Sequence, residues 1–305
     1  MTRRTAPLRP GDAVRFVSPA SPPDRASVEI RAKVLESWGL RVEIGPHAFD
    51  KTGFLAGSDD DRLSDVNDAF RDPDVRAVFA TRGGKGSYRI AHRLVFDAVR
   101  KDPKPLIGFS DITALHLSLW KNASIAGIHG TLTEDEFGVI SEPGSASLHR
   151  ILMTRDPIVL EARATEPTAV LTTTGRVTGP VIGGNLDMLA TTAGWALPPL
   201  KGAILLIEAV GLQPGQMDRP LTMLRLAGHF DGIVGVAIGR FTDCPPDREH
   251  IAAALLREHL AHHDVPILGG LPVGHGAHAL SVPVGETATL DADAGKLTFR
   301  EEQNA

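Results

Sequence analysis

The 305-residue sequence contains one cysteine, one tyrosine and few aromatic residues (5%). A single cysteine, Cys244, excludes an internal disulfide framework and a cysteine-rich zinc site; we expect a packed or loop thiol in a reducing compartment. No run of 18 apolar residues is present, and no apolar segment follows the basic residues at the start. These features predict a cytoplasmic protein that is neither exported nor inserted in a membrane.

The net charge of the chain bears on whether it binds nucleic acid. The chain has 32 Lys and Arg residues against 37 Asp and Glu residues, a formal charge of −5. This balance argues against a nucleic acid bound by bulk electrostatics. With 42% hydrophobic residues, the chain can bury one large core or two ordinary ones.

In the first half of the chain, short apolar runs alternate with helical patterns. This alternation predicts a mostly parallel sheet with helices on both faces, which is a three-layer α/β domain over residues 1–145. Ligands of such sheets bind at the carboxyl ends of the strands. The predicted strands are residues 14–17, 40–44, 75–80, 105–109 and 125–128, and the predicted helices are residues 27–38, 59–70, 88–99 and 111–120.

The pattern changes after residue 145. We expect an interdomain connection over residues 146–174 and then a β-rich, barrel-like α/β domain over residues 175–305. The sequence ends in a predicted hairpin. The predicted strands are residues 176–181, 203–207, 233–238, 266–268, 287–290 and 296–299, and the predicted helices are residues 186–192, 221–227 and 248–262.

Ser110 stands where an apolar strand meets an amphipathic helix. A serine on such a sharp turn exposes its hydroxyl, and the backbone N–H of Asp111 becomes free to bind an oxyanion. The segment departs from the G-x-S-x-G elbow because Ile112 replaces the second glycine. The alternative is that Ser110 caps the helix, with Asp111 in its first turn.

Two later segments can supply the base and the carboxylate that a nucleophilic serine requires. An apolar strand over residues 203–208 ends in Glu208, where a buried charge needs a partner. His275 lies between glycines in the loop of residues 271–278, from which its side chain can project. Each residue fits a structural ion pair equally well. The chain order Ser110, Glu208, His275 permits a catalytic triad.

Residues 81–88 are rich in glycine and follow the strand that ends at Ala80. Free backbone amides there can hold an anion or an oxyanion. The segment is not a phosphate loop, because a Walker A motif requires glycine at Phe79 and serine or threonine at Gly86. Nor is it a dinucleotide motif, because Arg89 stands at the third glycine position. We expect an oxyanion-binding or carboxylate-binding turn, or else a plain glycine turn.

Histidines cluster in two places, but neither cluster predicts a metal site. His259, His262 and His263 fall in a predicted helix, where a solvated face is typical, and His275 and His278 share a loop. No HExxH or HxxEH motif and no partner cysteine is present, so we expect no metal and no cofactor. A metallohydrolase that uses His275 and His278 is the least favoured alternative.

Nine short motifs together resemble one known family. They are residues 17–22 (VSPASP), 67–73 (NDAFRDP), 80–84 (ATRGG), 107–113 (IGFSDIT), 129–130 (HG), 183–186 (GGNL), 206–208 (LIE), 218–219 (DR) and 274–276 (GHG). In this order and over nearly the whole chain, they resemble the LD-carboxypeptidases. These are serine peptidases that include the muramoyltetrapeptide carboxypeptidases and the microcin C self-immunity peptidases.

The resemblance implies a triad of Ser110 as nucleophile, Glu208 as orienting carboxylate and His275 as general base and then acid. It implies an oxyanion hole from the backbone N–H groups of Gly84 and Asp111, and a site between an N-terminal α/β domain and a C-terminal β-rich domain. It further implies a cytoplasmic homodimer without a metal. The implied reaction removes the terminal D-alanine from a murein tetrapeptide during cell-wall recycling.

The sequence departs from the family pattern at three places. Lys85 and Ala209 stand where an aromatic and an acidic residue are common, and residues 215–217 replace an aromatic-basic-aliphatic triplet. The cation at Lys85 can pair with a substrate carboxylate. Within or beside the matching motifs, the candidate substrate-binding residues are Arg82, Lys85, Asn185 and Arg219.

Two other functions stay open. The same triad hydrolyses aminoacyl-nucleotide antibiotics in the microcin branch, which tends to be longer and to carry an extra aromatic-bearing loop. A non-catalytic α/β ligand-binding protein would bind an anion with Gly83, Gly84 and Gly86, and Ser110 would only cap a helix. We favour a muropeptide or a related small peptide as the substrate.

Overall fold

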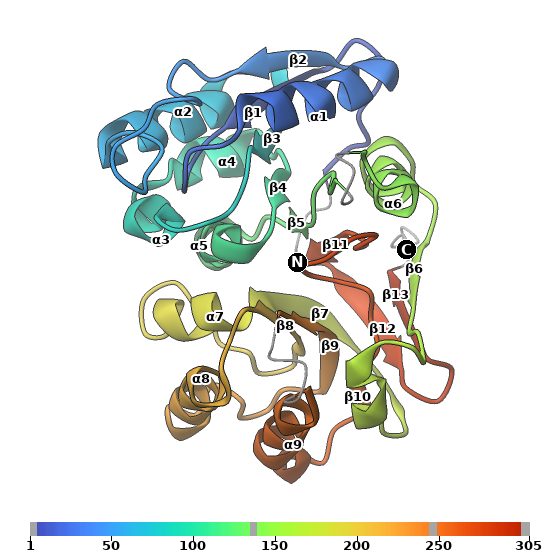
Figure 1. The fold of residues 1–305 in the computed structure, drawn as a ribbon. Helices are drawn as coiled ribbons and strands as arrows, with labels where there is room; N and C mark the ends of the chain where they lie inside the picture. The colour runs from blue at the N-terminus through green and yellow to red at the C-terminus, as the bar shows by residue number, and fades with distance from the viewer. Residues whose placement is uncertain (1–4, 135–138, 244–248, 300–305) are drawn as a thin grey trace.

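The computed structural model describes residues 5–134, 139–243 and 249–299. The chain forms two lobes, each built on one β-sheet, with most of the first half in the upper lobe of Figure 1 and most of the second half in the lower lobe. The α/β class with two sheets, predicted from the sequence, is confirmed. Cys244, which we expected to be a packed or loop thiol, lies outside the described residues.

Six strands form the first sheet, which is mostly parallel. Five of them run parallel, and the sixth returns from the second half of the chain and pairs antiparallel at one edge. In order across the sheet they are β11 (Val282–Val284), β5 (Gly127–His129), β4 (Leu106–Gly108), β3 (Val75–Ala80), β1 (Ala13–Val17) and β2 (Arg41–Ile44).

Helices cover both faces of this sheet, as predicted (Figure 1). One face packs against α1 (Arg25–Ser37) and α6 (Glu142–Met153) through a core that includes Phe16 and Phe79. The opposite face, with its own apolar core, packs against α2 (Asp59–Arg71), α3 (Ser87–Ile90), α4 (Phe96–Lys101) and α5 (Thr113–Ala123). The result is a three-layer lobe.

The helix predicted over residues 88–99 is interrupted. After α3 the chain forms the 3-10 turn η1 (Ala91–Arg93), becomes extended at Leu94 and restarts as α4. The side chain of Asn67 causes the break, because its Oδ1 accepts the N–H of Val95 and its Nδ2 donates to the carbonyl of Arg93. The amide takes the backbone groups that a continuous helix would use.

Seven strands form the second sheet. Its first four strands run parallel and the last three antiparallel, so the sheet is mixed. The described strands form an open sheet with two edges and not a closed barrel, which corrects the barrel-like expectation. In order they are β10 (Ile267–Leu268), β9 (Gly235–Thr242), β8 (Ile204–Val210), β7 (Arg176–Asn185), β12 (Thr287–Asp291), β13 (Lys296–Phe299) and β6 (Ile158–Glu161).

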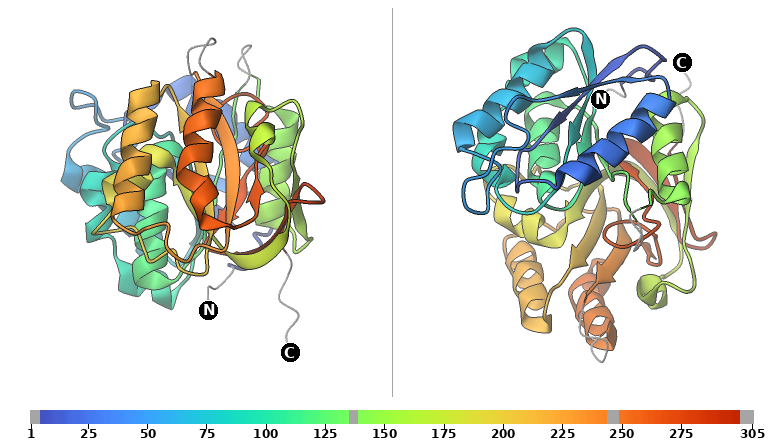
Figure 2. Two further views of the ribbon diagram at one scale, coloured as in Figure 1. Left: turned by 90° about the horizontal axis from the view of Figure 1, so that it is seen from below. Right: turned by 45° about the horizontal axis from the view of Figure 1, so that its top comes forward.

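Three helices cover one face of the second sheet: α7 (Leu186–Thr192), α8 (Pro214–Leu226) and α9 (Glu249–Leu260). Figure 2 shows α8 and α9 side by side in the view from below. The 3-10 turns η3 (Pro167–Leu171) and η5 (Ala261–His263) lie beside α9. The opposite face of the sheet contributes to the same apolar core as α1 and α6, so one core spans both lobes.

The chain crosses between the lobes more than once. The predicted connection, residues 146–174, contains most of α6, all of β6 and η3, and β6 forms an edge of the second sheet. Later, β11 leaves the second lobe and pairs with β5 of the first. These crossings fix the two lobes against each other.

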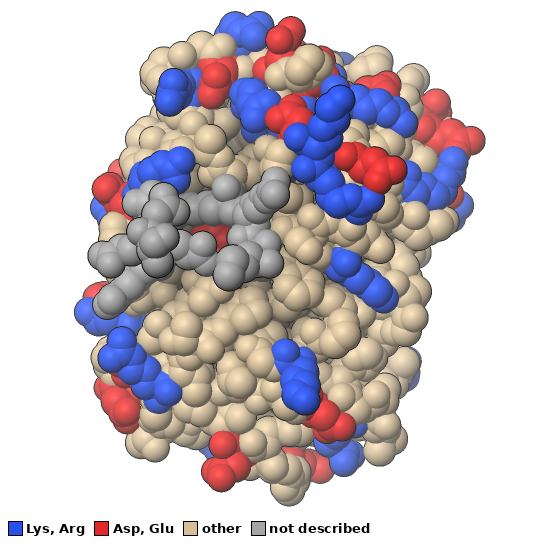
Figure 3. All heavy atoms as spheres, turned by 180° about the vertical axis from the view of Figure 1, so that it is seen from behind, with Lys and Arg blue, Asp and Glu red and all other residues tan. Residues whose placement is uncertain are grey.

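Charged side chains are unevenly distributed on the surface. On the face shown in Figure 3, basic and acidic side chains are intermixed at the top, and the middle of the face is mostly uncharged. None of the helices in the described ranges is long and apolar enough to cross a bilayer.

The shared core generates a stability prediction. Phe79 is 2% exposed and its ring centroid lies 5.5 Å from that of Phe16. We expect Phe79→Ala to lower the free energy of unfolding by about 3–5 kcal/mol, because it removes a buried ring and leaves a cavity. Phe54, which is 56% exposed, is the matched control, and Phe54→Ala should change stability by less than about 0.5 kcal/mol. Urea denaturation of the three proteins measures both; equal losses would contradict this account of the core.

Candidate active site

A sharp turn presents Ser110 at the carboxyl end of β4. Its backbone φ is 62°, in the left-handed region, which costs a non-glycine residue about 1–3 kcal/mol. It opens the 3-10 turn η2 (Ser110–Ile112) that leads into α5. The turn is tight, since a β-carbon on Gly108 would lie 2.8 Å from Cγ2 of Ile112. A strained strand-to-helix turn of this kind is the geometry of a nucleophile elbow.

The hydroxyl of Ser110 does not cap the helix. The N-cap residues of η2 and α5 are Phe109 and Ile112, and neither cap involves a side-chain hydrogen bond. In the described part of the chain, Ser110 Oγ has no hydrogen-bond partner. The capping alternative therefore has no support in the structure, and the hydroxyl is available for chemistry.

Glu208 is placed by an irregularity in β8. It pairs in register with Asn185 of β7, while the register between β8 and β9 shifts at this point. A bulge redirects a side chain from the regular alternation of a strand. The Glu208 side chain has no exposed surface; its Oε1 accepts a hydrogen bond from Asn185 Nδ2 at 3.1 Å and its Oε2 accepts one from His275 Nδ1 at 2.7 Å.

The environment keeps Glu208 ionised. Burial works to raise the pKa of this carboxyl, but the hydrogen bond and charge of His275 oppose it, together with His129 and Asn185. These interactions hold the pKa of Glu208 below its ordinary value. A carboxylate can only accept hydrogen bonds, so Nδ1 of His275 carries the proton and its Nε2 is the basic nitrogen.

Close backbone approach brings His275 to Glu208. Gly274 has φ 107°, and a β-carbon on it would lie 2.6 Å from Oε2 of Glu208, so only glycine fits there. The imidazole of His275 is 19% exposed, and its ring centroid lies 4.8 Å from that of Phe109, the neighbour of Ser110. Arg240 donates to the carbonyl of Ala277 at 2.7 Å and holds the loop.

Ser110 and His275 line the same cavity, which has a volume of 680 Å³. Ser110 comes from the first lobe and His275 from the second, so the cavity lies where the lobes meet. No hydrogen bond joins Ser110 Oγ to the imidazole in the described structure. Catalytic hydrogen bonds are often long without substrate.

The glycine-rich turn of residues 81–88 packs against Ser110 and is hydrogen-bonded to Asp111. A β-carbon on Gly83 would lie 3.0 Å from Cβ of Ser110. The Asp111 carboxylate accepts the N–H of Ser87 at 2.7 Å, and the Asp111 carbonyl accepts the Ser87 hydroxyl at 2.5 Å. Burial raises the pKa of Asp111. The backbone amide of Gly84 finds no protein acceptor in the described ranges, so it is free to bind an anion.

One wall of the cavity, formed by α1 and residues 131–134, carries charged side chains of both signs. The sequence patterns did not identify these side chains as part of the site. Arg31 donates to the carbonyl of Thr81 and, at 3.3 Å, to Glu134, whose other oxygen accepts from Ser27 at 3.3 Å. Asp24 also lines the cavity. These residues had no local signal, because a charged residue on a helix face normally predicts solvent exposure.

The predicted substrate-binding residues divide into two groups. Arg82 lines the cavity; Lys85 is exposed nearby without lining it, and its backbone N–H donates to Ser21. Asn185 is buried behind Glu208 and supports the carboxylate. Arg219 is exposed on α8 and is not among the cavity residues. Neither Asn185 nor Arg219 lines this cavity, and their roles in binding a substrate stay predictions.

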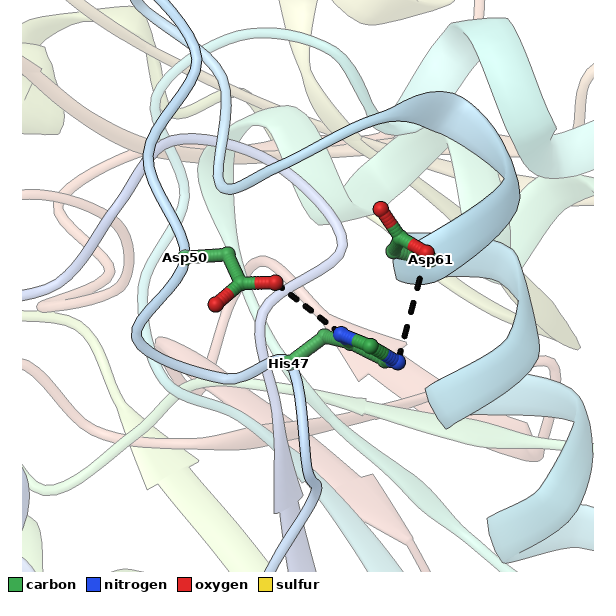
Figure 4. Close-up of side chains that lie close together, drawn as sticks. All are labelled: His47, Asp50 and Asp61. Atoms are coloured by element: carbon green, nitrogen blue, oxygen red, sulfur yellow. Dashed lines mark hydrogen bonds and ion pairs between the residues drawn. The ribbon is translucent and has the colours of Figure 1, made fainter.

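The one candidate metal cluster within the described residues is His47, Asp50 and Asp61, away from this cavity (Figure 4). His47 Nδ1 lies 2.9 Å from Asp50, and Nε2 lies 4.0 Å from Asp61. The hydrogen bond with Asp50 raises the pKa of His47. A metal requires a neutral imidazole with a free lone pair. Because both ring nitrogens face carboxylates, the cluster is explained by ion pairing. Within the described residues, His275 and His278 belong to no group of three His, Cys, Asp or Glu side chains close enough together to hold a metal ion.

A serine elbow and an acid–histidine pair around one cavity are typical of hydrolases with a serine nucleophile. Sequence comparison specifies the family. The N-terminal domain of the LD-carboxypeptidases matches residues 14–130, and their C-terminal domain matches residues 178–290. The chain belongs to the LD-carboxypeptidase family of peptidases.

Relatives extend over nearly the full chain. A probable murein peptide carboxypeptidase of Bacillus subtilis is 33% identical over 93% of this chain and 90% of its own length. The murein tetrapeptide carboxypeptidase of Pseudomonas aeruginosa is 34% identical, covering 92% and 93%. The microcin C7 self-immunity protein of Escherichia coli is 25% identical, covering 97% and 95%.

Solved structures agree with the fold. A muramoyltetrapeptide carboxypeptidase from Oxalobacter formigenes superposes with a TM-score of 0.82 at 25% identity, covering 95% of this chain and 99% of that one. A protein similar to the microcin immunity protein, from Bacillus anthracis, gives a TM-score of 0.86 at 24% identity, covering 98% and 99%.

The buried carboxylate generates a pH prediction. Because the folded-state pKa of Glu208 is below its ordinary value, its ionisation stabilises the folded protein above the unfolded-state pKa, and this contribution is lost as the pH falls through the folded-state pKa. We expect the free energy of unfolding to fall more steeply in the wild type than in Glu208→Gln as the pH falls below about 5. Urea denaturation across this range measures it. Parallel curves for the two proteins would count against an ionised Glu208.

Proposed function

We propose that the protein is a serine LD-carboxypeptidase that removes the terminal D-alanine from murein tetrapeptides. The observation that carries this proposal is the cavity into which the left-handed Ser110 and the Glu208-bound His275 both project from different lobes. The names of the B. subtilis and P. aeruginosa relatives support the substrate.

The geometry suits acylation of a serine. His275 Nε2 takes the proton of Ser110 as Oγ attacks the peptide carbonyl, and Glu208 stabilises the imidazolium that forms. The backbone N–H groups of Gly84 and Asp111 are the proposed oxyanion hole, worth about 2.7–4 kcal/mol per donor. His275 then protonates the leaving D-alanine amine, and a water that His275 deprotonates releases the acyl group.

The cavity walls favour a peptide with charged groups. Arg31 and Arg82 supply cations, and Asp24 and Glu134 supply carboxylates. A muropeptide carries carboxylates and an amine close to the scissile bond, and Arg binds a carboxylate through paired N–H groups. Charges of both signs therefore match this class of substrate.

The alternative substrate is an aminoacyl nucleotide. Microcin immunity proteins of the same fold have been solved with glutamyl sulfamoyl guanosine and aspartyl sulfamoyl adenosine. Two observations favour the murein peptide for this chain. Phe109 is the one aromatic ring other than histidine among the cavity residues described, and it packs on His275, so the described lining offers no free aromatic face for a base. The alignment with the E. coli protein spans 332 positions, so that protein has segments that this 305-residue chain lacks.

The family resemblance also leads us to propose a cytoplasmic homodimer. Size-exclusion chromatography with light scattering tests the oligomeric state, and fractionation of the cells tests the location. A mass of one chain at micromolar concentration would remove the homodimer from the proposal without affecting the chemistry.

The role of Ser110 generates the central prediction. We expect Ser110→Ala to retain its fold and to lose at least about 10³-fold in kcat on a disaccharide tetrapeptide, because the acyl-enzyme cannot form. Mass spectrometry of the released D-alanine and tripeptide measures turnover. Offering the tetrapeptide together with a glutamyl sulfamoyl nucleotide decides between the two substrates. Undiminished hydrolysis by Ser110→Ala would eliminate this mechanism.

The hydrogen bond between Ser87 of the glycine-rich turn and Asp111, the neighbour of Ser110, generates a second prediction. Ser87→Ala removes the hydroxyl that donates to the Asp111 carbonyl, so the two oxyanion donors should lose their alignment. We expect kcat to fall about tenfold with KM nearly unchanged, since the oxyanion forms only in the transition state.

Ser118→Ala is the matched control for Ser87→Ala. Ser118 is equally buried and its hydroxyl donates at 2.7 Å to the carbonyl of Ala91, in the 3-10 turn η1, and not to Asp111. Both variants should lose similar stability, and only Ser87→Ala should lose kcat. Equal losses of kcat would contradict a specific role for the Ser87 hydrogen bond.

A further inference from the structure

His129 lies at the end of β5, inside the first lobe. It pairs in register with Gly108 of β4 on one side and Val282 of β11 on the other, and it is 1% exposed. The histidine of residues 129–130 belongs to a motif that matches the family, but the sequence assigns it no role. The strand β5 pairs with β4, which leads to Ser110, and the side chain of His129 lies near the buried carboxylate of Glu208.

The imidazole of His129 is buried without a hydrogen bond. Neither Nδ1 nor Nε2 has a hydrogen-bond partner in the described structure, and the nearest charged atom is Oε1 of Glu208, 3.9 Å from Nε2. A buried polar group without a partner is costly, by about 1–3 kcal/mol for its desolvation. An interaction with the carboxylate compensates for this cost.

Burial keeps His129 neutral. Burial lowers its pKa to about 4, against the opposing effect of Glu208. The other titratable groups that face it are His275, from the second lobe, and His116 of α5. His116 is also neutral, because burial lowers its pKa to about 3, and its Nε2 contacts the Leu106 carbonyl. A neutral imidazole carries one N–H, which can sit on either nitrogen.

Two imidazoles flank the carboxylate of Glu208. His275 contacts Oε2 from the cavity, and His129 faces Oε1 from the interior. The ring of Phe109 lies near both imidazoles, with its centroid 4.8 Å from that of His275 and 6.1 Å from that of His129. Gly184 makes room, since a β-carbon there would lie 2.9 Å from Nδ1 of His129. The Nδ1 side is thus closed by backbone, and the Nε2 side faces the charge.

We propose that His129 is a positioning residue that directs its Nε2–H at Oε1 of Glu208 and holds the carboxylate in line with His275. The inference rests on the proposed function. During the reaction the proton of Ser110 moves to Nε2 of His275, and His129 keeps its single proton at Nε2. Its burial prevents it from competing for the transferred proton, so the positive charge forms on the cavity side.

Substitutions separate this role from packing. The amide nitrogen of glutamine can take the place of Nε2, that of asparagine takes the place of Nδ1, and leucine fills the space without a donor. We expect His129→Leu and His129→Asn to lower kcat about tenfold with KM unchanged, and His129→Gln to recover most of it. Steady-state kinetics on the murein tetrapeptide, per folded molecule, measures the effect.

His116→Leu is the matched control. This buried histidine neighbours His129 but contacts a backbone carbonyl and not Glu208, so its loss should lower the melting temperature and leave kcat within about twofold. Equal kcat losses in the Gln, Asn and Leu variants at position 129, or a His129→Leu enzyme with normal kcat, would overturn the proposal.

A second measurement does not depend on turnover or on the folding of a variant. Nitrogen-15 NMR of the wild type at pH 7 should show His129 as the neutral tautomer with its proton on Nε2. A proton on Nδ1, or a cation, would overturn the inference. If Ser110→Ala retained hydrolysis, the proposed triad would fail, and the NMR result would still report on the contact between His129 and Glu208.

Discussion

Glu208 carries a negative charge in a place without any exposed surface, and the arrangement around the site follows from compensating that charge. Asn185 and His275 each donate a hydrogen bond to one carboxylate oxygen, and His129 lies behind. Small residues allow this crowding, since a β-carbon on Gly239 would lie only 3.2 Å from Cβ of Glu208. An unpaired charge here would destabilise the fold by several kcal/mol, so the groups around Glu208 stabilise the fold as well as forming the site.

The groups that compensate this charge come from both lobes. Asn185 belongs to the second sheet, His275 to a loop after β10 and His129 to the first sheet. The pairing of β11 with β5 and the core shared by both lobes hold these parts together. The acid–histidine pair is therefore preorganised before any ligand binds. The remaining step is the approach of Ser110 Oγ to the imidazole across the cavity that both residues line.

The sequence predicted the residues whose local surroundings are distinctive. Ser110 follows a strand and precedes a helix, Glu208 is a charge at the end of an apolar run, and His275 lies between glycines; each pattern is local. The return of β11 to the first sheet depends on a partner more than 150 residues away, so no local pattern contains it. The interrupted helix after Gly86 escaped prediction for the same reason, because Asn67, on another helix, takes its backbone groups. Periodicity indicates which face of an element is buried, but not what covers it. Arg219 and Arg31 illustrate this limit: the first lies outside the cavity and the second lines it.

Arg31 joins the charged wall of the cavity to the glycine-rich turn. Its guanidinium donates to the carbonyl of Thr81, which begins the glycine turn, and also to Glu134 on the cavity wall. The glycine-rich turn packs closely against Ser110 at Gly83. A charged group of a peptide that bound this wall would act on the same guanidinium that fixes the turn. On the proposed function, binding energy from a part of the substrate remote from the scissile bond would then align the proposed oxyanion donors, which accelerates a reaction only if the alignment is better in the transition state than in the ground state. Because the wall and the turn share one cation, the selectivity of this cavity and its rate are expected to change together.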